Sequence, residues 1–250
     1  MRKSNSKLML AVSLAVTAKL GLPILAEART PASPAAAAIA DAARPAEDTA
    51  RDAERMPGAL MDFAGAKTGA KIAELAPGGG YYTRLLSLAV GPKGHIYAVS
   101  GRPVPALDGW VKDHPQVSVS VIKAGEALAP EPVDIVWTTE NYHDFKNAKV
   151  GESDAAALYN EAAFKALKPG GVYLINDHAA AVGAPADVTS TLHRIEAATV
   201  IREVEAAGFK YAGKSDALAH PADDHTMKVF DPAIRGKTDQ FVLKFVKPKG

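Results

Sequence analysis

The sequence contains no cysteine among its 250 residues. This absence excludes disulfide bonds, thiolate metal sites, a cysteine nucleophile and a lipoprotein anchor. An excess of charge of one sign is also missing, because 29 basic residues against 28 acidic ones give a formal net charge of +1. Proteins that bind nucleic acid usually carry a clear basic excess, so we expect no nucleic acid as a partner. The motif Gly-x-Ser-x-Gly is absent too, which excludes a serine hydrolase of the elbow type.

The first 28 residues have the three-part pattern of a secretory signal peptide. Arg2, Lys3 and Lys7 form a basic start, an apolar run of 11 residues follows at 8–18, and a small-x-small cleavage site lies at 26–28. The run is too short to span a bilayer, which takes about 20 residues. We therefore predict a signal peptide over 1–28 and an exported, periplasmic protein with no stable membrane anchor after cleavage. An uncleaved anchor, the alternative, would also place the rest of the chain outside.

The remaining chain divides into a linker and one domain. Residues 29–50 are rich in alanine and proline and offer no large side chain to bury, so they predict a flexible linker. Over 51–250, strand-type apolar runs alternate with helix-type segments. Strands are predicted at 71–76, 95–99, 117–122, 133–138, 172–176, 209–212 and 240–246, and helices at 51–64, 81–90, 154–167 and 197–207. This alternation predicts an α/β fold: a doubly wound, Rossmann-like, seven-stranded, mostly parallel sheet. The long polar segment before the last strand favours an antiparallel edge strand.

A glycine-rich stretch follows the first predicted strand, with the sequence ELAPGGG at 74–80. Ligands of doubly wound sheets bind at the carboxyl ends of the strands, and glycine lets the backbone approach a ligand closely. The helix that follows offers free N–H groups to an anion. A Walker loop would need a lysine where Tyr81 stands. A dinucleotide fingerprint would need glycine at Thr83 and an acid at Ser100, so both of these nucleotide sites are disfavoured.

The same stretch resembles the loop of class I S-adenosylmethionine (SAM) methyltransferases, acid-x-Gly-x-Gly-x-Gly, with Ala76 in place of the first glycine. The segments AGEA (124–127), DIVW (134–137) and FKALKPGGV (164–172) are similar to the family's adenine-contacting element, fourth strand and turn before the fifth strand. The ordered set ELAPGGGYYTR, TTENYHD, LKPGGVYLINDHA and RGKTDQFVLKF resembles a family of exported bacterial proteins labelled predicted methyltransferases. The likeness covers about residues 50–247.

This resemblance implies that the cofactor is SAM and that the reaction is methylation of a small-molecule substrate. The cofactor-binding residues that it implies are Glu74, Ala76, Pro77, Gly78, Gly79, Gly80, Ser100 and Glu126. Ser100 departs from the family pattern, because an acid usually holds the ribose hydroxyls at that position. A serine makes one hydrogen bond there rather than a charged bidentate pair. Export is a second departure, since SAM is made in the cytoplasm.

Polar residues after the fourth and fifth predicted strands are the candidates for chemistry. Methyl transfer is an in-line displacement, so the protein mainly aligns donor and acceptor. His143 is suited to remove the acceptor's proton near neutral pH, and Asp177 can orient its imidazole, which makes these two the predicted catalytic residues. The alternative is that these residues cap the next helix and bind loop backbone. The predicted substrate-binding residues are Asn141, Tyr142, Asp144, His178 and Arg235.

Residues 216–238 form a long connection with few helix signals, which we predict to be packed, for example as a lid. The segment contains His220, Asp223, Asp224 and His225, which are metal-binding residue types, but their spacing matches no metal signature. We therefore predict no metal site. His193 opens a predicted helix and has no evident partner in the sequence, so it is interpreted as a surface histidine.

Two functions from different classes remain. The first is a SAM-dependent methyltransferase, and the second is a non-catalytic exported binding protein that keeps the fold but holds another ligand. Ribose contacts near Ser100, for example from Arg102, would favour the enzyme, whereas a collapsed cavity or an adenine site filled by Tyr81 would favour the binding protein.

Overall fold

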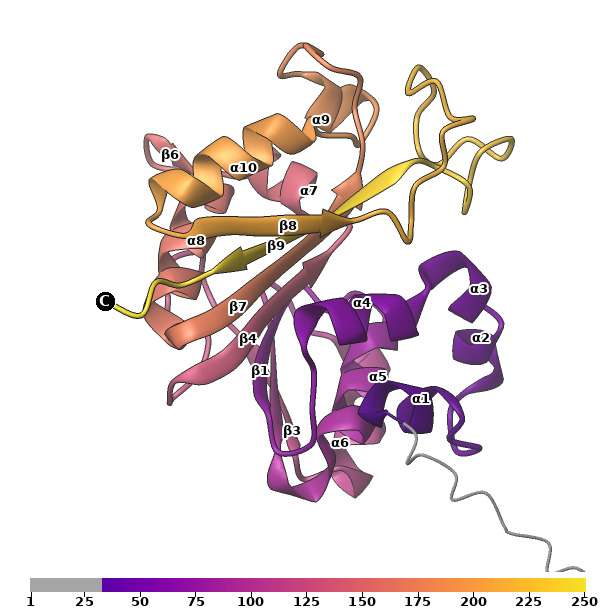
Figure 1. Cartoon of the computed structure of the whole chain (residues 1–250), viewed down its shortest axis with the longest axis vertical. Helices are drawn as coiled ribbons and strands as arrows, with labels where there is room; N and C mark the ends of the chain where they lie inside the picture. Colours follow the sequence, from indigo (N-terminus) through magenta and orange to yellow (C-terminus); the bar gives the residue numbers. More distant parts are fainter. Residues whose placement is uncertain (1–32) are drawn as a thin grey trace, which may run out of the picture. The chain divides into compact units, whose positions relative to one another are not determined.

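The computed structural model of the protein describes residues 33–250 (Figure 1). The predicted signal peptide, 1–28, and the start of the predicted linker lie outside the described residues. Within 33–250, no helix is both long enough and apolar enough to cross a membrane.

A seven-stranded sheet with the spatial order β3-β2-β1-β4-β7-β9-β8 forms the centre of the domain. Six strands are parallel, whereas β9 runs antiparallel to its neighbours β7 and β8. The strands are β1 (Lys71–Leu75), β2 (His95–Ser100), β3 (Val117–Val121), β4 (Val133–Thr139), β7 (Leu167–His178), β8 (Lys210–Ser215) and β9 (Gln240–Val246). The predicted mostly parallel sheet with an antiparallel strand on one side is confirmed. The antiparallel strand is β9, and β8 is the outermost strand next to it.

Helices cover both faces of the sheet (Figure 1). One face packs against α4 (Pro57–Ala64) and α5 (Tyr81–Val90), and the other against α8 (Ala155–Ala166) and α10 (Ala197–Ala206). Ile72 and Ala73, neighbours in β1, are both fully buried in different cores, because successive strand side chains point to opposite faces. This two-sided burial explains why the strands read as continuous apolar runs. The predicted helices 81–90, 154–167 and 197–207 are confirmed to within one residue at each end.

Several short elements connect this framework. The predicted helix 51–64 is divided into α3 (Asp52–Arg55) and α4, because Met56 adopts a left-handed φ of 43° and Pro57 begins the second helix. The other short elements are α6 (Trp110–Asp113), α7 (Tyr142–Asn147), α9 (Val188–Thr191), a hairpin of β5 (Lys149–Val150) and β6 (Ser153–Asp154), and 3₁₀ turns at Gly91–Lys93 and Pro105–Leu107.

The N-terminal segment differs from the predicted flexible linker. Residues from 33 onward form α1 (Pro34–Ile39) and α2 (Ala46–Thr49), and α1 packs against α4 and α5. Ala35 and Ala38 of α1 are almost fully buried. Their small side chains let α1 approach α4 and α5 closely. Arg44 also forms a bidentate ion pair with Asp52, at 2.6 and 2.7 Å. Close approach and paired charges therefore replace the apolar bulk that the segment lacks.

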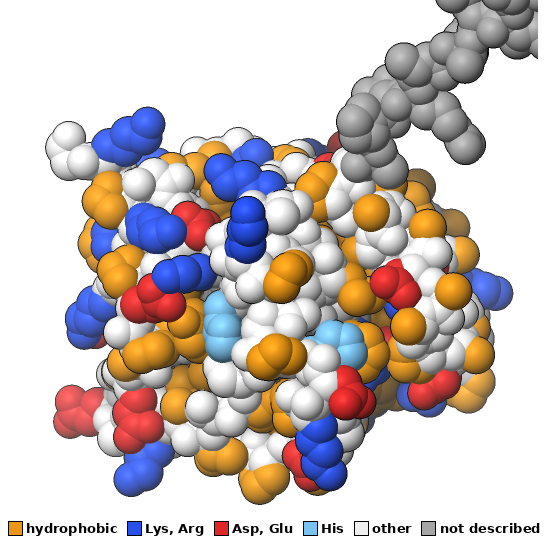
Figure 2. Space-filling view, turned by 90° about the horizontal axis from the view of Figure 1, so that it is seen from below, with side chains coloured by type: hydrophobic (Ala, Val, Ile, Leu, Met, Phe, Trp, Pro, Cys, Tyr) orange, Lys and Arg blue, Asp and Glu red, His pale blue; other side chains and the backbone are white. Residues whose placement is uncertain are grey.

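Charges of both signs are mixed on the surface. On the face shown in Figure 2, lysine and arginine side chains are interspersed with aspartate and glutamate side chains.

Candidate active site

The glycine stretch forms a loop between the end of β1 and the start of α5. Gly78 and Gly80 adopt left-handed φ angles of 58° and 82°, which glycine accepts without strain. A Cβ atom added to Gly78 or Gly79 would meet no other atom within 4 Å, so these two residues face open space. A Cβ on Gly80 would lie 2.4 Å from Leu107 Cδ2. The first two glycines therefore leave room for a ligand, and the third allows close packing.

A cavity of about 550 Å³ lies beside this loop. This volume is in the range of small-molecule sites. The wall opposite the loop is built by α2 and α3, and the carboxyl end of β4 completes it. The lining residues are Glu47, Asp48, Arg51, Arg55, Ala76–Gly79, Tyr81, Tyr82, Arg84, Ala106 and Thr139–Asn141. We call this space the loop cavity.

Two tyrosines that follow the glycines hold the N-terminal helices over the loop cavity. The Tyr81 hydroxyl donates to Asp52 Oδ1 at 2.7 Å, and the Tyr82 hydroxyl donates to the Arg55 carbonyl at 2.9 Å. Tyr81 lines the cavity without filling it. Tyr81 therefore does not occlude the site, and occlusion by this residue is what would have favoured the binding protein.

Sequence reasoning missed two arginines of the loop cavity, Arg51 and Arg55. Arg55 pairs with Glu140 at 2.9 Å, and Arg51 pairs with Glu54 at 3.1 Å. With Arg84 they make three arginines in the lining of the cavity, which also contains three carboxylates, Glu47, Asp48 and Glu140. No local signal marks Arg51 and Arg55, because their position depends on how α3 packs against α5.

The structure brings only part of the predicted cofactor set into the loop cavity. Ala76, Pro77, Gly78 and Gly79 line it, whereas the Glu74 side chain is buried beneath the loop and accepts a hydrogen bond from Thr83 Oγ1 at 2.5 Å. Burial raises the pKa of Glu74 to about 7. Ser100 Oγ accepts from the Arg102 amide at 3.3 Å, and Glu126 accepts from the Lys123 amide at 2.8 Å. These last two side chains do not line the loop cavity.

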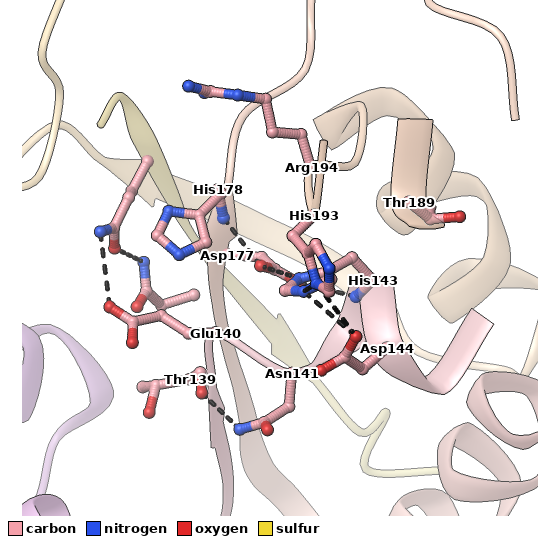
Figure 3. Close-up of polar contacts among 12 residues, drawn as sticks. Thr139, Glu140, Asn141, His143, Asp144, Asp177, His178, Thr189, His193 and Arg194 are labelled. Carbon is pink, nitrogen blue, oxygen red and sulfur yellow. Dashed lines mark hydrogen bonds and ion pairs between the residues drawn. The ribbon is translucent and has the colours of Figure 1, made fainter. Parts of the chain in front are cut away.

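The two predicted catalytic residues are in direct contact (Figure 3). His143 lies in the first turn of α7, and its Nδ1 is 2.7 Å from Asp177 Oδ1 at the end of β7. The Asp177 carboxylate also accepts from the backbone amides of His143 and His178, both at 2.8 Å. Its side chain is 0% exposed, so it is a buried, fully partnered carboxylate. Because Asp177 occupies Nδ1 of the imidazole, Nε2 is left to face His193 and Asp144.

The electrostatics of this pair follow from burial and mutual charge. Burial alone would lower the pKa of His143, but the charge and hydrogen bond of Asp177 outweigh it and raise that pKa. Burial alone would raise the pKa of Asp177, but the charge and hydrogen bonds of His143 keep it lowered. The pair therefore favours an imidazole that readily holds a proton next to a carboxylate that stays ionised.

The predicted substrate-binding residues are placed differently from one another. Asn141 lines the loop cavity, and its side-chain amide donates to the Ala76 carbonyl at 3.1 Å, which joins the two strand ends. Asp144 is exposed beside His143. His178 is directed to Thr238 Oγ1 at 2.9 Å. Tyr142 is fully buried, and its hydroxyl is hydrogen-bonded to Asn160 and Glu203. Arg235 is exposed and lines none of the cavities described. The structure therefore does not bring Tyr142 or Arg235 into the site.

His193 is a further site residue that sequence reasoning missed. Its Nδ1 lies 3.3 Å from His143 Nε2 and 3.5 Å from Asp144 Oδ1. His193 adopts a left-handed φ of 56° in the connection before α10, which is uncommon for a residue other than glycine. The preceding sequence contains no pattern that predicts this turn, so its proximity to His143 could not be foreseen.

Residues 216–238 contain no helix or strand and are anchored by a few buried side chains, among them Leu218, Asp223 and Val229, whereas Met227 and Phe230 are exposed. Arg194 is fully buried and holds Asp223 through a bidentate ion pair, with Nη1–Oδ2 at 2.8 Å and Nη2–Oδ1 at 3.0 Å. Its Nε donates to the Met227 carbonyl at 3.0 Å. Three of the four metal-binding residue types of this segment have other side-chain partners: Asp223 pairs with Arg194, Asp224 accepts from Thr226, and His225 contacts Asp239 at 3.0 Å.

A larger groove of about 710 Å³ lies between α7, α9 and α10. Lys146, a cation in its wall, is already paired with Asp154 and with Glu203 at 2.9 Å. No glycine backbone and no histidine lines this groove. The loop cavity and the adjacent His143–Asp177 pair therefore carry the stronger case for a functional site.

No protein-family model matches the chain, and no curated protein matches it in sequence. Solved structures do match. A SAM-dependent methyltransferase from Aquifex aeolicus is 19% identical, with 79% of this chain and 92% of that chain covered and a TM-score of 0.58. Aeropyrum pernix fibrillarin in complex with natively bound S-adenosyl-L-methionine is 20% identical, with 78% and 76% covered and a TM-score of 0.51.

The [4+2]-cyclase SpnF is 15% identical, with 79% of this chain and 81% of that chain covered and a TM-score of 0.60. At these identities the likeness shows the fold, which is the Rossmann-like fold of SAM-dependent methyltransferases. Because one fold supports several chemistries, function has to be argued from the site.

Proposed function

We propose that the protein is a SAM-dependent methyltransferase that acts on a small-molecule acceptor. One observation carries the proposal: the glycine loop opens into a cavity that the end of β4, Thr139–Asn141, also lines, and this segment is followed two residues later by His143. A donor held at the loop and an acceptor held at His143 would therefore meet at one edge of the sheet. Alignment of two reactants in this way is the main catalytic requirement of methyl transfer.

The residues of the loop cavity fit the cofactor. Gly78 and Gly79 present backbone without side chains, and the cavity volume suits a ligand of nucleoside size. Arg51 and Arg55 would hold a carboxylate through charge-assisted hydrogen bonds. When bound, SAM supplies a methyl group activated by its sulfonium. Contacts from Ser100 and Glu126 to its adenosine part rest on the family resemblance alone.

The His143–Asp177 pair would activate the acceptor. Nε2 of His143 would accept the acceptor's proton, and the Asp177 carboxylate would stabilise the imidazolium that forms. Asn141 would keep the glycine loop in register with the end of β4 through its bond to Ala76. Asp144 and His178 lie on either side of His143 and would contact the acceptor.

Export to the periplasm is part of the proposal and rests on the pattern of residues 1–28. Fractionation of cells that express the full chain, with mass spectrometry of the product, tests it. A periplasmic protein that begins at Arg29 is expected; a full-length product in the cytoplasm contradicts export.

Isothermal titration with SAM and with S-adenosylhomocysteine tests the enzyme proposal on residues 29–250. We expect saturable binding of both ligands. Gly79→Val should abolish it, because the new side chain would occupy the loop cavity while φ stays outside the left-handed region. Gly109→Val is the matched control, since a Cβ at Gly109 also meets no atom within 4 Å but lies outside the cavity. The absence of heat and of a thermal shift with either ligand would contradict the proposal.

A further inference from the structure

Three potential ligand atoms form a nearly equilateral triangle beside the loop cavity (Figure 3). His143 Nε2 and His193 Nδ1 are 3.3 Å apart, and Asp144 Oδ1 lies 3.4 Å from the first and 3.5 Å from the second. A tetrahedral zinc site with bonds of about 2.0 to 2.2 Å separates its ligand atoms by about 3.3 to 3.6 Å. The three spacings match the edges of such a site.

A hydrogen-bonded cluster explains these spacings less well. Good hydrogen bonds between nitrogen and oxygen are about 2.7 to 3.2 Å long, and both contacts of Asp144 exceed that range. The contact between the two imidazoles, at 3.3 Å, is also at the long end for a hydrogen bond. The three polar atoms thus surround one point, but no two of them lie at the distance of a good hydrogen bond. A shared ion at that point would account for all three distances.

Asp177 provides a second, independent observation. It is fully buried and accepts from Nδ1 of His143 at 2.7 Å, which directs the free Nε2 lone pair toward the triangle. Histidines that bind a metal almost always donate their other ring N–H to a carboxylate or carbonyl in this way. Asp177 is itself held by two backbone amides, so the ring orientation is fixed before any ligand arrives.

The backbone at His193 is strained in a manner that fits a ligand position. Its left-handed φ of 56° is sparsely populated by residues with a Cβ, and such strain persists only where the surroundings enforce it. The contact that holds this backbone conformation is made by the next residue in the chain, Arg194, which is fully buried against Asp223. The Phe230 ring packs against the His193 ring with centroids 4.8 Å apart and limits its rotation.

We propose that His143, Asp144 and His193 bind one divalent transition-metal ion, with zinc as the representative. Imidazole nitrogen and carboxylate oxygen together suit such ions. The Asp144 side chain is 54% exposed, so the fourth coordination position faces solvent. Three protein ligands with one open position are typical of catalytic rather than structural zinc sites. This proposal departs from the sequence-based expectation of no metal, which considered only residues 220–225.

The open coordination position also indicates which class of acceptor the site would take, an inference that rests on the proposed methyl transfer. A hydroxyl or thiol that binds there would lose its proton to solvent more easily, because the cation stabilises the anion. The acceptor oxygen or sulfur then forms a bond to the methyl carbon as the carbon–sulfur bond of the sulfonium breaks, and the donor sulfur keeps the electron pair. While the ion is bound, Nε2 of His143 is occupied and does not accept the proton. We therefore expect hydroxyl or thiol acceptors rather than carbon nucleophiles.

The test is titration of untagged, chelator-treated protein with Zn²⁺ in the absence of SAM, followed by visible spectroscopy with Co²⁺. We expect one ion per chain and the d–d absorption of a tetrahedral cobalt site. His193→Asn and Asp144→Asn should each weaken binding at least tenfold, and Asp177→Asn by roughly 10- to 100-fold. Asparagine at position 193 tolerates the left-handed backbone, so the fold should remain intact. His220→Asn is the matched control and should bind as the wild type does.

Two results would overturn the metal site: no zinc heat and no cobalt band in the wild type, or equal affinities for His193→Asn and His220→Asn. Mercaptoethanol tests the open position, because a thiolate that binds cobalt adds a new charge-transfer band. An unchanged spectrum contradicts the inferred acceptor class. The proposed function fails independently, through loss of SAM binding. Zinc binding without SAM binding therefore leaves the metal site intact and removes the methyltransferase.

Discussion

Arg84 and Asp48 form a buried bidentate ion pair that joins α5 to α2. Arg84 Nε lies 2.5 Å from Asp48 Oδ2, and Nη2 lies 2.8 Å from Oδ1. α5 is the helix that follows the glycine loop, and α2 belongs to the N-terminal segment. The pair therefore fixes one wall of the loop cavity to the other.

We expect Asp48→Ala to lower the free energy of unfolding by about 3 to 5 kcal/mol, because a buried guanidinium would lose its counter-charge. Urea unfolding followed by circular dichroism measures this. Asp216→Ala is the control, since it breaks the exposed pair Lys214–Asp216 and should leave the unfolding midpoint unchanged. Equal midpoints for the two variants would show that the Arg84–Asp48 pair is not buried in solution.

The buried carboxyl of Glu74 predicts that stability falls as the pH rises. Burial raises its pKa from 4.5 in the unfolded chain to about 7 in the folded one. The folded state thus favours the protonated form, whose contribution is complete below pH 4.5 and is lost as the pH rises through 7. Glu74→Gln cannot ionise and retains an acceptor for the Thr83 hydroxyl. We expect the variant to match the wild type at acidic pH and to exceed it by about 3 kcal/mol above pH 8.

Urea unfolding of both proteins between pH 4.5 and 8 measures this difference. Other groups titrate in the same range, but their contributions cancel when the two proteins are compared at each pH. A difference in stability that does not change with pH would mean that Glu74 ionises normally in the folded protein.

Ala76 stands where the family resemblance has a glycine, and its φ is 54°. An alanine in this region carries strain of about 1 to 2 kcal/mol. Ala76→Gly relieves that strain but adds freedom to the unfolded chain worth about 0.5 to 1 kcal/mol. We expect it to be neutral or slightly stabilising, whereas Ala76→Val should destabilise the protein by about 1 to 3 kcal/mol. Thermal unfolding of the pair decides the matter: a glycine variant that melts below the wild type contradicts the left-handed backbone.

Arg194 predicts the behaviour of residues 216–238. Arg194→Leu leaves the buried Asp223 carboxylate without its cation and frees the Met227 carbonyl. We expect a loss of about 3 to 5 kcal/mol in the free energy of unfolding and faster proteolytic cleavage within 216–238. Arg235→Leu, at an exposed position in the same segment, should be cut at the wild-type rate. Identical cleavage of both variants would show that the segment holds its structure without Arg194.

Much of the fold could be predicted from the sequence because its signals are local. Alternating apolar runs and glycine-terminated helices give the strand and helix positions, and the rule that parallel strands end at one edge brings His143 to Asp177. His143 follows β4 and Asp177 lies at the end of β7, and these two strands are neighbours in the sheet. No more than residue type and strand order was required for this prediction.

The errors concern contacts that no local pattern encodes. The expectation of a linker at 29–50 assumed that small side chains do not dock, but alanines allow α1 to lie close to α5. The partners of its charged residues are far away in the chain; Asp48 and Arg84 are 36 positions apart. His193 joins His143 over 50 positions through a left-handed turn. Such pairings depend on the finished packing, so the arginines and the second histidine of the site could not be inferred.

The position of β9 has a consequence for the order of folding. β9 follows β7 and β8 in the chain but lies between them in the sheet. β8 therefore has no strand partner until residues 240–246 have been synthesised and inserted. Asn176 and Asp177, which lie opposite β9, reach their final environment only at that stage. The glycine-loop half of the domain can pair its strands without β9, whereas the half that carries the His143–Asp177 pair closes last. Closure through such long-range strand pairing is intrinsically slow.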